Sequence, residues 1–124
     1  MKLDTERGVS LFKALGDDSR LRIVLALLRR ELCVCQIVGL LDLAPSTISR
    51  HLQILKDAGL IRGNKKGRWI YYQFNTRAIG EGIGPLLEPL LSTVAKSDQG
   101  RDDYSKLTGL LKIDPEVLRE RMTA

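Results

Sequence analysis

The spacing of apolar residues along the first sixty positions predicts four amphipathic helices. Apolar residues recur there at intervals of three and four, which places them on one face of an α-helix. The four segments are residues 5–15, 19–30, 33–42 and 45–58. Pro45 suits the first turn of the fourth helix, and Gly59 is typical of a helix C-terminus. The third and fourth segments, joined by a tight turn, predict a helix-turn-helix.

The period of the pattern changes from three or four residues to two after Gly59. In the segment "RWIYYQF", Trp69 and the alternate residues Tyr71 and Gln73 face one way, and the residues between them face the other. A second short β-type run, "LIRG", precedes it, and the basic segment "NKKG" separates the two. This arrangement predicts a β-hairpin with a basic tip. The expected fold class is mainly α with a β-hairpin wing, a winged helix-turn-helix.

Beyond the hairpin the pattern is less regular. Residues 76–96 contain apolar residues at helical spacing, but the segment is also rich in glycine and proline. Because Pro89 cannot donate a backbone hydrogen bond, we expect a break or kink near residues 84–89. Residues 97–106 are polar and are expected to form a linker, and "DPEVLRERM" a short terminal helix. We therefore expect one domain over residues 1–96 and a polar tail over residues 97–124.

Composition and charge narrow the class of protein. About 44% of the 124 residues are apolar, and no apolar run approaches the roughly 20 residues of a membrane-spanning helix. The N-terminus lacks the apolar core of a signal peptide, so we expect a cytoplasmic protein without a membrane partner. Residues 45–75 hold six basic residues and one acidic residue, which accounts for the whole net charge of +5. Such a localised excess favours a nucleic-acid partner, although a solvated basic surface would look the same.

The fourth helix and the hairpin tip supply candidate DNA contacts. Hydroxyl, amide, imidazole and guanidinium groups hydrogen-bond phosphates and base edges, and here they gather in the N-terminal half of the helix. The candidates on the helix are Ser46, Thr47, Ser49, Arg50, His51 and Gln53. The candidates on the wing are Lys65, Lys66 and Arg68. The alternative is a merely polar helix face, but the ordered set of helix-turn-helix, basic hairpin and concentrated charge favours double-stranded DNA.

The two cysteines of the chain stand two residues apart, at Cys33 and Cys35. In a regular helix these side chains point about 200° apart, so chelation of one atom by both requires the start of the third helix to unwind. The helix N-terminus and the neighbouring Arg29 and Arg30 favour thiolate, and thiolates prefer soft ions. From spacing alone, buried packing is an equal alternative. Redox sensing by the two thiols is another.

An enzyme is not expected from this sequence. A thiol reductase would be the obvious candidate, but the chain lacks a C-x-x-C motif, a βαβ pattern and a phosphate-binding loop. The single histidine is not accompanied by an acid–base constellation. A binding protein accounts better for the concentrated charge.

Four segments together resemble the ArsR/SmtB family of winged-helix transcriptional repressors. They are "ALGDDSRLRIVLALL", "ELCVC", "APSTISRHLQILKDAGLI" and "GRWIYYQF". The resemblance implies a homodimer that binds operator DNA and leaves it when a toxic metal or metalloid binds. Residues 1–96 would then combine DNA binding with dimerisation. Apolar residues expected at the dimer interface are Val9, Phe12, Ile83, Leu87 and Leu90.

Within that family, "ELCVC" is similar to the arsenite and antimonite sensing motif of the arsenical-resistance repressors. The motif often has a third cysteine three residues after the second, and here that position is Val38. The resemblance therefore implies a metalloid site formed by Cys33 and Cys35 alone. Its expected inducers are As(III), methylarsenite or Sb(III), with no permanently bound cofactor.

Overall fold

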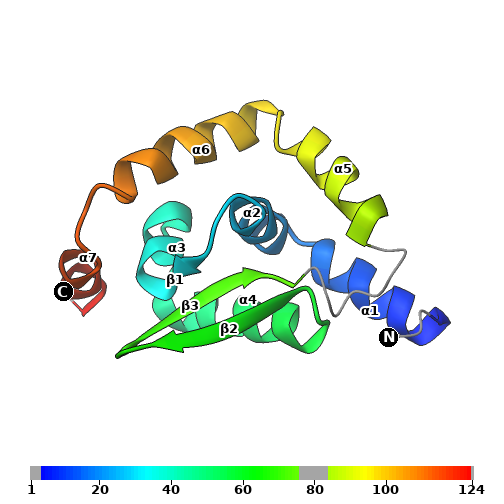
Figure 1. The fold of residues 1–124 in the computed structure, drawn as a ribbon, viewed down its shortest axis with the longest axis horizontal. Helices are drawn as coiled ribbons and strands as arrows, with labels where there is room; N and C mark the ends of the chain where they lie inside the picture. Colours follow the sequence, from blue (N-terminus) through cyan, green and yellow to red (C-terminus); the bar gives the residue numbers. More distant parts are fainter. Residues whose placement is uncertain (1–3, 76–83, 124) are drawn as a thin grey trace.

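The computed structural model describes residues 4–75 and 84–123 of the chain (Figure 1). The elements are α1 Thr5–Leu15, α2 Asp18–Leu27, β1 Leu32–Cys33, α3 Val34–Leu41, α4 Pro45–Asp57, β2 Ile61–Lys66, β3 Trp69–Phe74, α5 Gly84–Val94, α6 Asp98–Leu110 and α7 Pro115–Thr123. The four predicted helices and the hairpin are confirmed. The second helix ends three residues earlier than expected, and Cys33 precedes the third helix rather than belonging to it.

Local side-chain and backbone chemistry defines the helix ends. Asp4 and Asp17 cap α1 and α2, each accepting a hydrogen bond from the backbone N–H three residues later. Pro45 occupies the first turn of α4, as predicted. Gly59 has a φ of 78°, a conformation that favours glycine, and its N–H donates to the Lys56 carbonyl. These features fix the length of α4 and the direction in which the hairpin leaves it.

The sheet has three antiparallel strands in the order β1-β3-β2. Strands β2 and β3 form the predicted hairpin, with Ile61 opposite Phe74 and Lys66 opposite Trp69. The expected tip is displaced, because β2 continues through Lys66 and the turn lies at Gly67 and Arg68. Strand β1 was not predicted from the sequence, because two residues are too short for an alternating pattern. It pairs Leu32 with Tyr72 and Cys33 with Tyr71. The segment containing the first cysteine is therefore joined to the wing through the sheet.

The core surrounds α2, in which residues 23–27 are all buried. Side chains from α3, α4 and the strands close it, and the fully buried residues include Ile23, Leu32, Ile37, Leu40, Ile48, Leu55, Leu60 and Ile61. Helices α3 and α4 pack on each other and α4 also packs on α2. The helix-turn-helix is thus part of the hydrophobic core rather than an appendage.

Helices α5, α6 and α7 follow an arc that passes over α2 and α3 and ends beside α3 (Figure 1). The expected break at Pro89 is not seen, since α5 includes this residue in its interior. Here only one backbone donor is lost, and Pro89 itself is exposed. The expected linker at residues 97–106 is also wrong, because most of it belongs to α6, which Ser97 caps. Residues 76–83, including Ile83, lie outside the described residues.

Candidate functional site

Helix α4 presents a polar face opposite its buried stripe. Ile48, Leu52 and Leu55 anchor the helix in the core. Ser46, Ser49, Arg50 and Gln53 are exposed, whereas Thr47 is half-buried. The predicted DNA-contacting residues of α4 other than His51 therefore lie at or near the surface of a helix that is anchored in the core.

His51 is placed differently from its neighbours on α4. Its side chain is only 14% exposed. The ring Nδ1 lies 3.3 Å from Nη1 of Arg20 and 4.0 Å from a carboxylate oxygen of Asp17, both on the start of α2. His51 thus helps to seat α4 against α2, and its expected contact with DNA stays a prediction.

The wing cations are exposed but two of them already have acidic partners. Lys66 forms an ion pair with Glu31, which precedes β1, and Arg68 forms one with Glu116 on α7. Lys65 is also exposed, on β2 close to the turn of the hairpin. No sequence pattern indicated these pairs, because the partners are separated by 35 residues or more along the chain. They connect the wing to the segments that surround the cysteines.

Cys33 and Cys35 are both buried, with exposures of 1% and 4%. They form a small cluster with Leu118, and partly buried side chains of Tyr71, Leu110, Ile113 and Met122 pack against it. Cys33 has extended backbone angles of −82° and 164° and caps α3, while Cys35 lies in the first turn. Both thiols belong to this one cluster and line the same hollow. The expected unwinding of α3 is therefore unnecessary, because Cys33 is already outside the helix.

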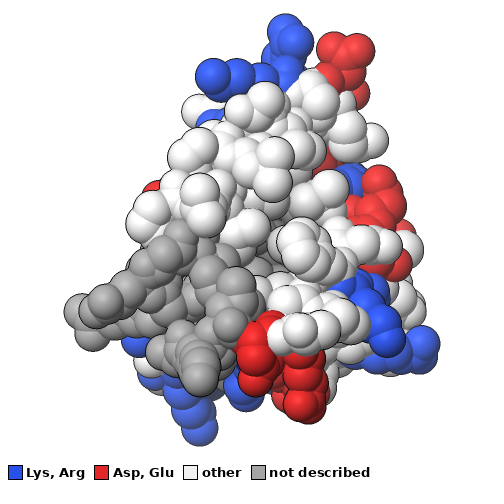
Figure 2. All heavy atoms as spheres, turned by 90° about the vertical axis from the view of Figure 1, so that its right-hand side faces the viewer, with Lys and Arg blue, Asp and Glu red and all other residues white. Residues whose placement is uncertain are grey.

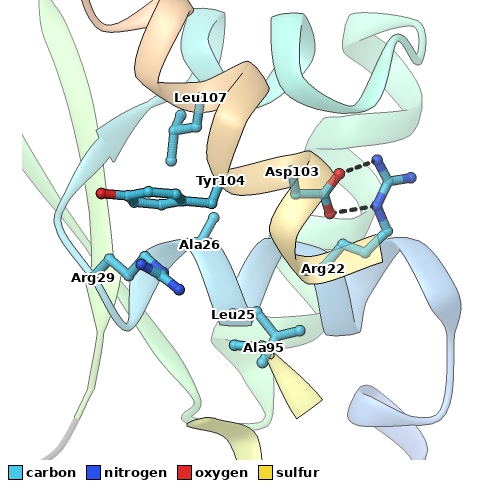
Figure 3. Close-up of a pocket in the computed structure, with 9 residues that line it drawn as sticks. Arg22, Leu25, Ala26, Arg29, Ala95, Asp103, Tyr104 and Leu107 are labelled. Atoms are coloured by element: carbon cyan, nitrogen blue, oxygen red, sulfur yellow. Dashed lines mark hydrogen bonds and ion pairs between the residues drawn. The ribbon is translucent and has the colours of Figure 1, made fainter. Parts of the chain in front are cut away.

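The protonation state of Cys35 also differs from the expectation. Burial raises the pKa of its thiol from 9.0 to about 12, and a hydrogen bond with Cys33 contributes in the same direction. The Cys35 thiol is therefore protonated at neutral pH. Arg29 lies over another residue, its guanidinium carbon 4.2 Å from the centroid of the Tyr104 ring on α6 (Figure 3). Arg30 is exposed to solvent.

Helix α7 covers the two thiols and also contacts the wing. Leu118, 3% exposed, contributes its buried side chain to the cysteine cluster. The guanidinium carbon of Arg119 lies 5.3 Å from the centroid of the Trp69 ring. Together with the ion pair between Arg68 and Glu116, this contact attaches α7 to the hairpin. The role of α7 could not be predicted from the sequence, because one buried leucine in a polar segment gives no periodic signal.

Comparisons with known proteins decide the family. Residues 17–62, which run from the start of α2 into β2, match the family model described as "Bacterial regulatory protein, arsR family". The chain is also 39% identical over 90 residues to the arsenical resistance operon repressor of Bacillus subtilis (strain 168), covering 72% of this chain and 83% of that protein. The chain belongs to the arsR family.

Two further members indicate the extent of the similarity. The arsenic resistance transcriptional regulator ArsR1 of Pseudomonas putida is 44% identical over 66 residues. Because the match covers 52% of each, this chain spans about half the length of that relative. A solved structure of a homodimeric winged helix-turn-helix DNA-binding domain, Mb0332 from Mycobacterium bovis, is described as a possible ArsR-family transcriptional regulator. It shares 30% identity with a TM-score of 0.60, covering 73% of this chain and 79% of that chain.

These comparisons confirm the winged helix-turn-helix fold, and the arsR-family relatives are transcriptional regulators rather than enzymes. None of the helices in residues 4–75 and 84–123 is both long and apolar enough to cross a membrane. Among the described residues, no three His, Cys, Asp or Glu side chains gather to hold a metal ion. A soft-ligand site in this arsR-family chain would therefore depend on the two cysteines.

The end of the molecule that carries α1 and α5 has a broad uncharged surface (Figure 2). Four of the large apolar side chains on these helices are exposed, namely Val9, Phe12, Leu86 and Leu90, with Phe12 at 74%. Leu87 is half-buried against the core. Contiguous exposed apolar surface is typical of a protein–protein interface. The arrangement is compatible with dimerisation through α1 and α5, which stays a prediction for this arsR-family chain.

Helices α2 and α6 are joined by a polar clamp beside Tyr104 (Figure 3). Nε and Nη2 of Arg22 donate to the two carboxylate oxygens of Asp103, each at 2.9 Å. This bidentate pairing raises the pKa of Arg22. Arg22 and Asp103 also line the small pocket at this point. Their pairing holds α6 against α2.

Proposed function

We propose that this chain is a transcriptional repressor that binds operator DNA as a homodimer. The exposed polar face of α4 would enter the major groove, because its apolar face is fixed in the core and its N-terminal half carries the exposed Ser46, Ser49 and Arg50. The wing cations Lys65, Lys66 and Arg68 would contact the flanking phosphate backbone. The exposed apolar residues of α1 and α5 support the dimer.

We further propose that a trivalent arsenical or antimonial releases the DNA by binding Cys33 and Cys35. The observation that carries this proposal is that the two thiols belong to one buried cluster and line the same hollow, one at the end of β1 and the other in the first turn of α3. Two sulfurs in one cluster can both bind one thiophilic atom when the junction of β1 and α3 adjusts to it. The names of the relatives from B. subtilis and P. putida support an arsenical as the signal.

The position of the thiols explains how binding would reach the DNA-contacting elements. Cys33 pairs with Tyr71 on the wing strand β3, and Cys35 belongs to α3, which packs on α4. Formation of two sulfur–arsenic bonds would fix the distance between these two cysteines. A ligand that binds a rearranged β1–α3 junction more tightly shifts the population toward it, so that the wing and α4 no longer fit one DNA site together.

Redox sensing is the second candidate, and the placement of two free thiols in one buried cluster favours it over a protein without a sensor. Oxidation would act at the same junction of β1 and α3. However, a direct disulfide across one intervening residue is geometrically unfavourable, and the protonated Cys35 thiol is a poor nucleophile.

The decisive experiment is a DNA-release titration followed by fluorescence anisotropy. The reduced protein would be bound to a labelled duplex from the promoter upstream of its own gene, and arsenite, methylarsenite, antimonite, zinc and peroxide would be added separately. The matched control is the variant with Cys33→Ser and Cys35→Ser. The proposal is supported when a trivalent arsenical or antimonial releases the DNA from the wild type but not from the double variant. Release by peroxide alone would replace it with redox sensing, and no release by any compound would leave the cysteines as packing residues.

A further inference from the structure

A second hollow, of about 510 Å3, lies between α3, α6, α7 and the turn that joins α3 to α4. Its floor is formed by apolar side chains from three helices, namely Val38 of α3, Leu110 of α6, and Leu118 and Met122 of α7. Sites for small molecules usually have volumes of roughly 300–1,000 Å3 and combine a mainly apolar lining with a few polar groups. The hollow therefore has the size and the floor of a small-molecule site.

Three charged side chains lie at the edge of this hollow. Lys106 of α6 forms an ion pair with Asp42, the C-cap residue of α3. Arg121 of α7 is exposed and has no acidic partner among residues 4–75 and 84–123. Two positive groups and one negative group leave the lining with a net charge of one positive unit. The group without a partner is thus a guanidinium that stands beside an apolar floor.

These features together define the chemistry of an occupant. A guanidinium binds a carboxylate through two parallel hydrogen bonds, so Arg121 favours a ligand with one carboxylate group. A small inorganic anion would leave the apolar floor uncovered, and a neutral apolar molecule would leave Arg121 without a partner. An organic monocarboxylate with a hydrocarbon body satisfies both parts of the site.

We propose that this hollow binds a small organic monocarboxylate, whose charge pairs with Arg121 and whose hydrocarbon body lies on the apolar floor, and that the ligand holds α7 against α3. Among the described residues of α7, only Leu118 is fully buried. A ligand that contacts α3, α6 and α7 at once binds only while α7 is in place, so it stabilises that arrangement by mass action. Because Cys35 also lines the hollow, its thiol becomes less accessible.

The test is a titration of the reduced, DNA-free full chain followed by two-dimensional amide NMR. Octanoate is the probe, and octan-1-ol, with the same chain length and no charge, is its neutral counterpart. Arg121→Gln removes the guanidinium. Lys112→Gln is the matched control, because it removes one positive charge from an exposed residue that does not line the hollow. The spectrum of each variant shows whether the fold is retained.

The wild type is expected to bind octanoate about two- to fivefold more tightly than octan-1-ol, since the ion pair is partly exposed to solvent. The largest shifts should occur at the amides of Gly39, Leu43 and Leu110, which line the hollow. Arg121→Gln should abolish the preference for octanoate, and Lys112→Gln should retain it. A merely apolar surface would bind the less water-soluble alcohol better. Preference for octan-1-ol, or shifts confined to the exposed apolar residues of α1 and α5, would overturn the site.

The effect on α7 is measured by alkylation of Cys35 with iodoacetamide in the Cys33→Ser variant. Octanoate at ten times its Kd should slow the reaction by up to about tenfold, and adding Arg121→Gln should reduce this protection. Binding without slower alkylation would overturn the conclusion that the ligand holds α7 in place. Neither measurement uses an arsenical or DNA. Failure of this site therefore leaves the proposed sensor untouched, and failure of the sensor in the DNA-release titration leaves this site untouched.

Discussion

Helices α4 and α7 are held to the rest of the molecule in contrasting ways. Helix α4 inserts three buried side chains into the main core and leaves its polar face open. Helix α7 packs on α3 through one buried leucine and the half-buried Met122, and an ion pair and a cation–π contact join it to the wing. The predicted DNA-contacting surface is therefore fixed by the core, whereas α7, with a single fully buried side chain, is expected to open more readily.

The largest difference is expected when one buried side chain is removed from each helix. Ile48→Ala should lower the free energy of unfolding by about 2–5 kcal/mol, because it leaves a cavity in the core under α4. Leu118→Ala should lower it by less than half as much, since α7 detaches without unfolding the core. Urea denaturation measures both values, and hydrogen exchange should show α7 amides exchanging long before those of α4. Equal losses for the two variants would mean that α7 belongs to the core.

The clamp between α2 and α6 is expected to contribute an intermediate effect. Asp103→Ala removes both acceptors of the Arg22 guanidinium and should destabilise the fold by about 1–3 kcal/mol. Asp102→Ala is the matched control, because Asp102 neighbours Asp103 on α6 and is exposed. A double-mutant cycle with Arg22→Ala isolates the pairing. A loss no larger than that of the control would show that the position of α6 depends on Leu107 and Tyr104 instead.

The contrast between α4 and α7 also explains what could be predicted from the sequence. Ile48, Leu52 and Leu55 repeat at helical spacing, and Pro45 and Gly59 mark the ends, so α4 and its polar face follow directly from local chemistry. The hairpin likewise follows from alternation. Helix α6 was missed because only Leu107 is buried along its length, and the Arg22–Asp103 pair joins residues 81 apart in the sequence.

The candidate thiol site was predicted by residue type but not by environment. The positions of Cys33 and Cys35 indicated a two-sulfur site, yet strand β1 is too short to be detected and exists only because β3 lies beside it. The expected thiolate was wrong for Cys35, because its burial depends on α7, more than 80 residues later in the chain. Tertiary contacts of this kind leave no trace in local periodicity.

The thiol chemistry provides a test of how well α7 covers the site. Because the pKa of Cys35 is raised to about 12, its alkylation by iodoacetamide at pH 8 should be at least about tenfold slower than that of an unfolded cysteine peptide. The alkylation rate should rise with pH up to about 12. The free energy of unfolding should follow the same group: the contribution of the protonated thiol is fully present below pH 9.0 and is lost as the pH rises toward 12. Leu118→Ala should accelerate the reaction at pH 8. Mass spectrometry of peptides from the Cys33→Ser variant assigns the rate to Cys35, and a fast reaction in that variant would contradict the burial.

The smallest expected effect concerns the ion pair that joins α7 to the wing. Glu116→Gln should increase DNA affinity by about two- to threefold at low salt. In the wild type Arg68 must give up its ion pair with Glu116 before it can contact a DNA phosphate, and the variant removes this cost. Glu120→Gln is the matched control, since it removes one negative charge from the exposed surface of the same helix. DNA affinity would be measured by anisotropy titrations at two salt concentrations. An effect of net charge alone would be reproduced by Glu120→Gln, whereas an effect of the Arg68–Glu116 pair would not. A decrease in affinity for Glu116→Gln alone would show that α7 holds the wing in its DNA-binding position, so that the weakly attached helix would help to shape the DNA-contacting surface.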